Sequence, residues 1–197
     1  MGSGGWRQEL ENLALGPEQV EKLEIFLDLL EQWSSVYNLI GQVRKAEVLR
    51  DHVQESLIAA PWLLPGELVD VGSGNGFPGV ALLVARGNLR GILLEPRRRR
   101  WAFLKEVLRQ LRLPGEVWRK RLEEVSWLKA NNVSIRGVAR EVWERELSRV
   151  VRPGGRVLWW AGPRAAAEPP DGFTSVVTCP LPNPARGRLV VWGRCST

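Results

Sequence analysis

The N-terminal third of the chain has the apolar spacing of amphipathic helices. A helix is expected to begin at Pro17, which suits the first helical position, with Glu18 in the first turn. Apolar residues then recur every three or four positions, on one helical face, at Val20, Leu23, Leu27 and Leu30. A second helix is predicted over residues 45–60, ending before Pro61. We therefore expect residues 1–64 to form a helical extension.

From residue 65 onward, short apolar runs alternate with helical patterns, which predicts βαβ units around a parallel sheet. The expected strands cover residues 67–71, 90–95, 116–119, 132–136 and 156–160. A helix over 79–86 follows the first strand, and another follows the arginines at 97–100. A third is expected over 138–150, with a shared face formed by Ala139, Trp143, Leu147 and Val150. The fold class is therefore α/β, with residues 65–197 as the main domain.

The C-terminal part of the chain predicts a closing antiparallel hairpin. Two apolar runs, at 175–178 and 188–192, are separated by the turn-rich segment 182–187. Such a hairpin is atypical of the sheet of a simple dehydrogenase.

The stretch Leu68–Gly79 is the centre of this arrangement, because a short apolar strand there breaks into a glycine loop and then a helix. Gly72, Gly74 and Gly76 allow a sharp turn and a close approach of the backbone to a ligand. Pro78 suits the first position of the helix, whose N-terminal amides would point at that ligand. The stretch predicts a nucleotide-type cradle, although a purely structural turn is the alternative.

The spacing of the glycines distinguishes between cofactors. Gly74, Gly76 and Gly79 spell the dinucleotide fingerprint, but that fingerprint should begin where the strand ends, so its register does not fit NAD. An acidic residue ending the strand, Asp70, followed by G-x-G-x-G resembles motif I of the class I S-adenosylmethionine (SAM) methyltransferases. Asp70, Gly72, Ser73 and Gly74 are therefore candidate cofactor-binding residues.

Glu95 ends the next apolar run, close to the ~20-residue spacing expected of a carboxylate that binds a ribose. A carboxylate at this place can accept hydrogen bonds from both ribose hydroxyls. A solvated glutamate at a strand end is the alternative, and the nearby glycine loop favours the cofactor role.

Composition adds an anionic partner to this picture. The 197-residue chain carries a net charge of +6 and has a pI near 10.0, which suggests nucleic acid. Four arginines, Arg97–Arg100, begin a helix, where positive charge opposes the helix dipole. Together with Arg119, Lys120 and Arg121 they are candidate phosphate contacts, and a solvated basic face is the alternative. The ten tryptophans scatter through every element, which favours packing over a base-stacking array.

Other features limit the class of protein. No apolar run approaches the ~18 residues of a membrane span, and no metal site is expected from two cysteines and one histidine. We expect a cytoplasmic protein with no membrane partner and no obligate protein partner.

Several motifs, in order from about residue 17 to about residue 160, resemble one family closely. They include Tyr37-Asn38-Leu39-Ile40-Gly41, His52-Val53-Gln54-Glu55-Ser56-Leu57, Asp70-Val71-Gly72-Ser73-Gly74-Asn75-Gly76-Phe77-Pro78-Gly79, Leu93-Leu94-Glu95, Arg121-Leu122-Glu123-Glu124 and Ile135-Arg136-Gly137. The chain is similar to the bacterial glucose-inhibited division protein B family, which methylates N7 of a guanine in the 530 loop of 16S ribosomal RNA. The resemblance implies a class I methyltransferase fold, SAM as cofactor, and 16S rRNA or the 30S subunit as partner.

The resemblance also implies roles for individual residues. Around the cofactor it places Gly72 and Phe77 on the loop, Glu95, Pro96 and Arg97 along the ribose edge, and Leu122 and Glu123 beside the adenine. It places Arg136 where the methyl donor meets the substrate. Asn38, His52 and Ser56 are implied at the mouth of the site, and His52 and Ser56 are four apart, so one helical face can present both. A structural histidine, a salt-bridged arginine and a helix-capping asparagine are the alternatives.

Two positions depart from the family pattern. Glu55 stands where the family usually has Asp, and Ala161 stands where it usually has Lys. Any phosphate contact of that lysine must come from Arg164 or another residue, or be absent. This departure leaves open a non-catalytic RNA-binding or assembly factor, beside a class I methyltransferase for another RNA site or for a small molecule.

The implied chemistry needs little machinery. Guanine N7 is an unprotonated acceptor that can attack an electrophilic methyl group directly, so no general base is required. Methylation of cytosine C5 would need a nucleophilic cysteine, and Cys179 is expected on a late strand, away from the site.

Overall fold

The computed structural model describes residues 6–37, 39 and 45–196. Its centre is a seven-stranded sheet of order β3-β2-β1-β4-β5-β7-β6. The strands are β1 (Gly66–Val71), β2 (Leu89–Leu94), β3 (Gly115–Trp118), β4 (Ala130–Arg136), β5 (Val151–Ala161), β6 (Phe173–Pro180) and β7 (Arg188–Arg194). Strands β1 to β5 pair in parallel, and β7 pairs antiparallel with both β5 and β6. The predicted α/β class and the closing hairpin are confirmed.

Strand β1 lies at the point where the strand order reverses. It pairs in parallel with β2 on one side and with β4 on the other. Its residues from Leu68 to Val71 are buried, as expected of a strand covered on both faces. In open α/β sheets, ligands bind beyond the carboxyl ends of the strands at this switch point. The glycine loop that follows β1 lies there.

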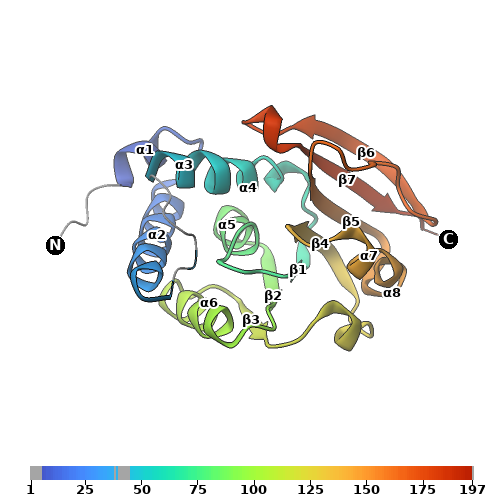
Figure 1. Ribbon diagram of the computed structural model, residues 1–197, viewed down its shortest axis with the longest axis horizontal. Helices are drawn as coiled ribbons and strands as arrows, with labels where there is room; N and C mark the ends of the chain where they lie inside the picture. The colour runs from blue at the N-terminus through green and yellow to red at the C-terminus, as the bar shows by residue number, and fades with distance from the viewer. Residues whose placement is uncertain (1–5, 38, 40–44, 197) are drawn as a thin grey trace.

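Helices cover both faces of the sheet (Figure 1). On one face lie α2 (Pro17–Tyr37), α5 (Gly79–Ala85) and α6 (Arg98–Gln110), and the short helix α1 (Arg7–Glu11) adds Leu10 to the same hydrophobic cluster. The other face is covered by α7 (Arg140–Trp143) and α8 (Leu147–Val150), around a second cluster. Because side chains alternate along a strand, β1 contributes Leu68 to the first cluster and Val69 to the second.

The N-terminal helices share their core with the sheet. Phe26 of α2 packs on Phe77 and Phe103, with ring centroids 5.0 and 6.3 Å apart. The buried stripe of α6 includes Leu104, Val107 and Leu108, with Leu111 buried at its C-cap. The division of the chain between residues 64 and 65 stays a prediction, since one continuous cluster spans that boundary.

The predicted helix over residues 45–60 is less regular than its pattern suggests. It consists of α3 (Lys45–Val48), a wide π-helical stretch (Leu49–Gln54), α4 (Glu55–Leu57) and a final 3-10 turn (Ala60–Trp62). The expected end before Pro61 is wrong, because Pro61 lies inside this last turn. Proline lacks an amide hydrogen, which a first turn does not need.

The predicted helix over residues 138–150 is broken into α7, a 3-10 turn (Glu144–Glu146) and α8. Trp143, Leu147 and Val150 are fully buried as expected, whereas Ala139 is exposed and extended just before α7. Strand β5 begins at Val151, five residues earlier than predicted. The pairing of β5 with β4 is irregular between Val151 and Arg156, where Gly154 has a left-handed φ of +75°. None of the described helices is long and apolar enough to cross a membrane.

Candidate functional site

A pocket of about 540 Å³ opens beyond the carboxyl ends of β1 and β2. Its volume is within the range of small-molecule and cofactor sites. Six of the predicted cofactor residues line it, namely Gly72, Glu95, Pro96, Arg97, Leu122 and Glu123. These residues come from three separate segments, which the fold brings together at one edge of the sheet.

The pocket also has an apolar side that the sequence did not reveal. Val71, Leu94, Val138 and Val142 contribute to its lining. Val142 is 49% exposed although it is aliphatic, which is unfavourable unless something covers it. An apolar wall facing a polar rim suits a purine ring attached to a ribose.

The glycine loop has the backbone geometry that its sequence predicts. Gly72, Gly74 and Gly76 have φ values of +69°, +57° and +96°, in the left-handed region that favours glycine. A Cβ atom at Gly72 would lie 2.7 Å from Cγ2 of Val138, across the pocket wall. The loop therefore needs glycine at this position for both backbone conformation and space.

Glu95 connects the loop to the segment that follows β2. Its side chain is 3% exposed, and Oε2 accepts a hydrogen bond from the Gly74 amide at 2.9 Å while Oε1 accepts from the Arg97 amide at 2.8 Å. A carboxylate offers about four acceptor positions, so both oxygens can still accept from hydroxyl groups in the pocket. The position fits the predicted ribose contact and excludes the alternative of a solvated strand-end glutamate.

Asp70 lies beneath the loop and does not line the pocket. It is fully buried, and Ser134 on β4 donates to its Oδ1 at 2.6 Å. A Cβ atom at Gly79 would collide with Oδ2, so the start of α5 packs directly on this carboxyl. Burial raises the pKa of Asp70 to about 6, against the opposing effect of the hydrogen bond from Ser134. In this structure Asp70 shapes the loop from below.

Ser73 and Gly74 are also buried and do not line the pocket. The Ser73 amide donates to the carbonyl of Leu94 at 2.9 Å, and its hydroxyl donates to the carbonyl of Asp70 at 3.0 Å. Direct contact of Asp70, Ser73 and Gly74 with the cofactor stays a prediction. In the structure, the hydrogen bonds of these residues hold the glycine loop in place.

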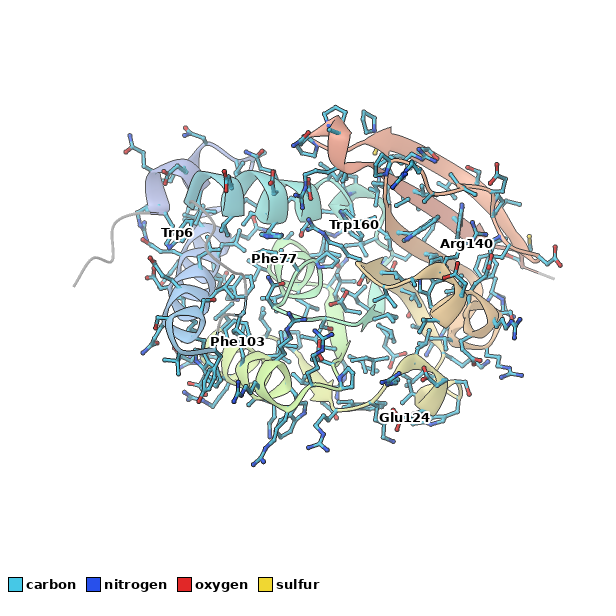
Figure 2. The ribbon with its side chains drawn as sticks, in the orientation of Figure 1. Trp6, Phe77, Phe103, Glu124, Arg140 and Trp160 are labelled. Carbon is cyan, nitrogen blue, oxygen red and sulfur yellow. The ribbon has the colours of Figure 1, made fainter. Side chains whose placement is uncertain are left out.

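Phe77 and His52 form an aromatic stack beside the loop. Their ring centroids are 5.2 Å apart and the rings are 17° from parallel. Phe77 is 5% exposed and lies in the interior of the molecule (Figure 2). Burial, followed by the positive charges of Arg136 and Arg186, lowers the pKa of His52 to about 4, although Asp51 acts in the opposite direction. His52 is therefore neutral at physiological pH.

Arg136, at the end of β4, belongs to a buried ionic cluster. Its Nη2 donates to the carboxylate of Glu55 and to the carbonyl of Asp51. Glu55 is fully buried, and its Oε1 also accepts from Nε of Arg186 at 2.9 Å. The other terminal nitrogen of Arg136, Nη1, is buried without a hydrogen-bond partner. Arg136 adjoins the pocket through its neighbour Gly137, which is part of the lining.

Burial raises the pKa of Glu55, while the charges of Arg136 and Arg186 oppose that shift. The backbone carbonyl of Glu55 accepts from the Trp160 indole at 2.6 Å. Three parts of the chain therefore meet at Glu55: the N-terminal helical segment, the ends of β4 and β5, and the turn before β7.

Ser56, expected at the mouth of the site, does not line the pocket. Ser56 is fully buried, and its hydroxyl donates to the carbonyl of His52 in its own helix. The expectation that one helical face presents both His52 and Ser56 stays a prediction, although Ser56 is bound to the backbone of its own helix. Asn38 lies outside the described residues. A catalytic role for either Ser56 or Asn38 stays a prediction.

The rim of the pocket is basic. Arg97, Arg100, Lys120 and Arg121 all contribute to it. Arg97 caps α6, as its sequence suggested, and the guanidinium of Arg99 lies 5.3 Å from the ring centre of Tyr37. Ala161, where the related family usually has lysine, is 1% exposed. Arg164, the suggested substitute, is exposed and is not part of this rim.

Comparison with known proteins identifies the family. A sequence model described as GidB, rRNA small subunit methyltransferase G, matches residues 19–176. The chain belongs to this family.

Curated relatives support the family assignment. The "Ribosomal RNA small subunit methyltransferase G 1" of Syntrophobacter fumaroxidans is 37% identical over 160 residues, which cover 76% of this chain and 73% of that protein. The protein of Paramagnetospirillum magneticum, named "Ribosomal RNA small subunit methyltransferase G", is 34% identical over 164 residues, covering 82% and 73% respectively. The family predicted from the motifs is confirmed.

Solved structures support the fold. A methyltransferase from Geobacter sulfurreducens superimposes with a TM-score of 0.63 at 14% identity, covering 96% of this chain and 94% of that one. An O-methyltransferase from Bacillus cereus, solved in complex with SAH, gives 0.64 at 12% identity, covering 95% and 96%. The predicted class I methyltransferase fold of this family member is confirmed.

Arg186 is the functional candidate that sequence reasoning missed. It lies in the 3-10 turn Pro184–Arg186 between β6 and β7, outside the segment matched by the family model. Besides Glu55, its Nη1 lies 3.4 Å from Oδ2 of Asp51. The only signal in the sequence was a second arginine, Arg188, close to the turn-rich segment.

Proposed function

We propose that this protein transfers the methyl group of SAM to N7 of a guanine in the 530 loop of 16S ribosomal RNA. Membership of the rRNA small subunit methyltransferase G family supports the enzyme class, the cofactor and the kind of substrate. The observation that supports the site most directly is the convergence of six predicted cofactor residues on one pocket at the switch point of the sheet.

The residues present fit SAM. Glu95 can accept hydrogen bonds from both ribose hydroxyls, and Leu122 and Val142 offer apolar surface to the adenine. The glycine loop brings backbone close to the methionine part, since a side chain at Gly72 would strike Val138. When bound, SAM supplies an electrophilic methyl group on a sulfonium sulfur.

The protein's contribution to the reaction is alignment. Guanine N7 has a free lone pair, so no residue must remove a proton before transfer. Holding N7 and the methyl group in line supplies roughly 7 to 11 kcal/mol in favourable cases. Among the described residues that line the pocket there is no cysteine, serine or histidine. Cys179, the nucleophile that cytosine C5 chemistry would require, lies on the edge strand β6.

Arg136 and the His52–Phe77 stack are proposed to face the substrate. Neutral His52 offers an uncharged aromatic surface, which suits a stacked base better than a proton-transfer role. The buried Nη1 of Arg136 has no partner in the structure and can donate to an acceptor on the base or on the RNA backbone. Asn38 is proposed to act with them.

The basic rim is proposed to bind RNA phosphates. Arg97, Arg100, Lys120 and Arg121 surround the pocket opening, and Arg98, Arg99 and Arg119 extend the positive surface. For binding through such contacts, the logarithm of the association constant falls linearly with the logarithm of the salt concentration. The 30S subunit or an assembly intermediate in the cytoplasm is the proposed form of the substrate.

One observation favours a second candidate, a non-catalytic RNA-binding or assembly factor. Ala161, which is buried, stands where the family usually has lysine, so the positive charge of that lysine is missing at this position. Two arginines lie near this position: Arg188 is the partner of Ala161 in the sheet, and Arg186 precedes Gly187, which packs against the backbone of Ala161.

Transfer of labelled methyl from SAM to 30S subunits, prepared from cells that lack the family enzyme, tests the proposal. Wild-type protein should incorporate label into 16S rRNA, and Arg136→Ala should abolish it while SAM binding by calorimetry persists. Arg164→Ala is the matched control and should retain activity. SAM binding without incorporation into any ribosomal RNA would favour the non-catalytic candidate.

A further inference from the structure

Trp127 is an exception among the tryptophans. Five of the ten, all of which lie in the described part of the chain, are buried, for example Trp143, which packs against Trp159 and Trp192 with ring centroids 5.3 and 6.2 Å apart. Trp127 is 64% exposed, and among the described residues it is the tryptophan that lies mostly in solvent. Leaving so large an apolar surface in water is unfavourable. Packing in the core therefore does not explain the position of Trp127.

The indole of Trp127 is held in place although it is exposed. Its neighbours Val125 and Leu128 are buried at 0% and 8% exposure, which anchors the backbone on both sides. The preceding 3-10 turn (Leu122–Val125) is fixed by the Arg121 amide, which donates to Glu124 Oε2 at 2.7 Å. Glu124 marks the place of this turn at the edge of the molecule (Figure 2).

A second indole lies against Trp127. The ring centroids of Trp118 and Trp127 are 5.7 Å apart, with 33° between the ring planes. Trp118 is fixed in turn, because its Nε1 donates to Glu116 Oε2 at 3.0 Å and Glu116 forms an ion pair with Arg90 at 2.7 Å. The two indoles therefore form a preorganised aromatic surface, referred to below as the indole platform (Trp118 and Trp127).

Cations connect the indole platform to the cofactor pocket. Arg119, Lys120 and Arg121 follow Trp118 directly in the chain and are all exposed. Lys120 and Arg121 also line the pocket rim. A base resting on Trp127 would thus have its phosphates beside a basic segment that leads to the place of methyl transfer.

We propose that Trp127 stacks against an unpaired base of the RNA substrate that flanks the target nucleotide. Exposed aromatic rings interleaved with cations are the chemistry by which proteins hold single-stranded nucleic acid, since every base has a π-face and every linkage a negative charge. This inference rests on the proposed function, and it adds a contact that neither the motifs nor the family match assigns.

The test is binding of a 16S rRNA fragment that contains the target loop, measured over a range of salt concentrations. Stacking on an aromatic side chain changes affinity by about 5- to 150-fold per base, so Trp127→Ala should weaken binding within that range. Trp127→Phe should restore most of the affinity. The slope of the logarithm of the binding constant against the logarithm of salt concentration should be unchanged in both Trp127 variants. Arg119→Gln should reduce the magnitude of this slope by about one.

Val176→Ala is the matched control, because Val176 is an exposed apolar residue on β6, away from the pocket. It should bind RNA like the wild type, and SAM affinity should be the same in every variant. Wild-type binding with no effect of Trp127→Ala would overturn the stacking proposal alone. Weakened binding to 30S subunits but not to the RNA fragment would also overturn it, and would point to a protein contact. Absence of RNA binding by the wild type would overturn the proposed function as well.

Discussion

Glu55 and Arg186 lie 131 residues apart in the chain, yet Nε of Arg186 donates to Oε1 of Glu55 at 2.9 Å. The second oxygen of the same carboxylate accepts from Arg136. One buried negative charge thus serves two guanidinium groups, one at the carboxyl end of β4 and one in the turn before β7. This shared contact fixes the orientation of Arg136, the residue proposed to face the substrate.

Replacing Glu55 with glutamine should destabilise the fold strongly. The amide keeps the shape of the side chain but removes the buried charge that both guanidinium groups contact, although Arg186 keeps its 3.4 Å contact with Asp51. Breaking a buried pair costs about 3 to 5 kcal/mol of unfolding free energy. Urea unfolding would measure the difference. Glu67→Gln is the control, because Glu67 pairs with Arg152 at the surface and should lose less than about 1 kcal/mol. Equal losses in the two variants would refute the special role of Glu55.

Removing Arg186 should impair methyl transfer more than stability. Its side chain is 40% exposed, so solvent screens much of the lost ion pair. Without it, Glu55 can rotate and Arg136 loses its fixed orientation. We expect Arg186→Ala to lower kcat at least tenfold with little change in SAM affinity, and Arg186→Lys to recover part of it. A variant that loses SAM affinity instead would place Arg186 in a different role.

His52 should make the protein less stable as the pH falls below neutrality. Its pKa is about 4 in the folded state and 6.5 ordinarily, so between these values the unfolded chain binds more protons. Stability contributed by neutral His52 is therefore present above pH 6.5 and is lost progressively toward pH 4. The side chain introduced by His52→Gln does not titrate, so between pH 6.5 and pH 4 this variant should lose about 1 to 3 kcal/mol less unfolding free energy than the wild type. Identical losses, measured by urea unfolding at several pH values, would exclude a buried neutral histidine.

Asp70 should make the protein less stable as the pH rises, which is the opposite of the effect of His52. Its pKa is raised to about 6 from the ordinary 3.8, so the folded state binds more protons between these values and stability from this group falls as pH rises through them. Relative to Asp70→Asn, the wild type should lose up to about 3 kcal/mol between pH 4 and pH 7. Ser134→Ala removes a hydrogen bond to the charged form, which raises the folded-state pKa further and should extend this loss to higher pH. A wild-type advantage that grows with pH would contradict the assigned shift.

The glycine loop should tolerate no side chain at its first position. Gly72→Ala places a methyl group against Val138 in a left-handed backbone conformation, and we expect SAM affinity to fall more than tenfold by calorimetry. Gly87→Ala is the control, because nothing lies within 4 Å of a Cβ atom there and its φ is not left-handed. If both variants bind SAM like the wild type, the loop is not the cofactor cradle.

Local sequence was sufficient for the cofactor side of the site. Gly72 and Glu95 follow adjacent parallel strands, and the carboxyl ends of such strands meet at one edge of a sheet, so their convergence follows from the βαβ pattern alone. The apolar stripe of α6 follows from its period in the same way. These features depend on neighbours in sequence or on a repeated topology.

The substrate side depended on contacts that no local pattern encodes. Arg186 reaches Glu55 only because the β6–β7 turn folds back over the end of β5, and a turn-rich segment does not indicate where its side chains point. The burial of Ser56 depends on the packing of its helix, and its hydroxyl donates to the backbone carbonyl of His52, which residue spacing does not indicate. The exposure of Trp127 likewise depends on how one short turn is anchored, and its apolar character alone suggested burial.

The position of the transferred methyl group tests the central claim most directly. After reaction of the wild-type protein with unmethylated 30S subunits and labelled SAM, the modified nucleotide would be located by nuclease digestion and mass spectrometry. We predict one N7-methylguanosine, in the 530 loop of 16S rRNA, which is absent with Arg136→Ala. Label at another nucleotide, at another atom of guanine, or in no RNA at all would contradict the account.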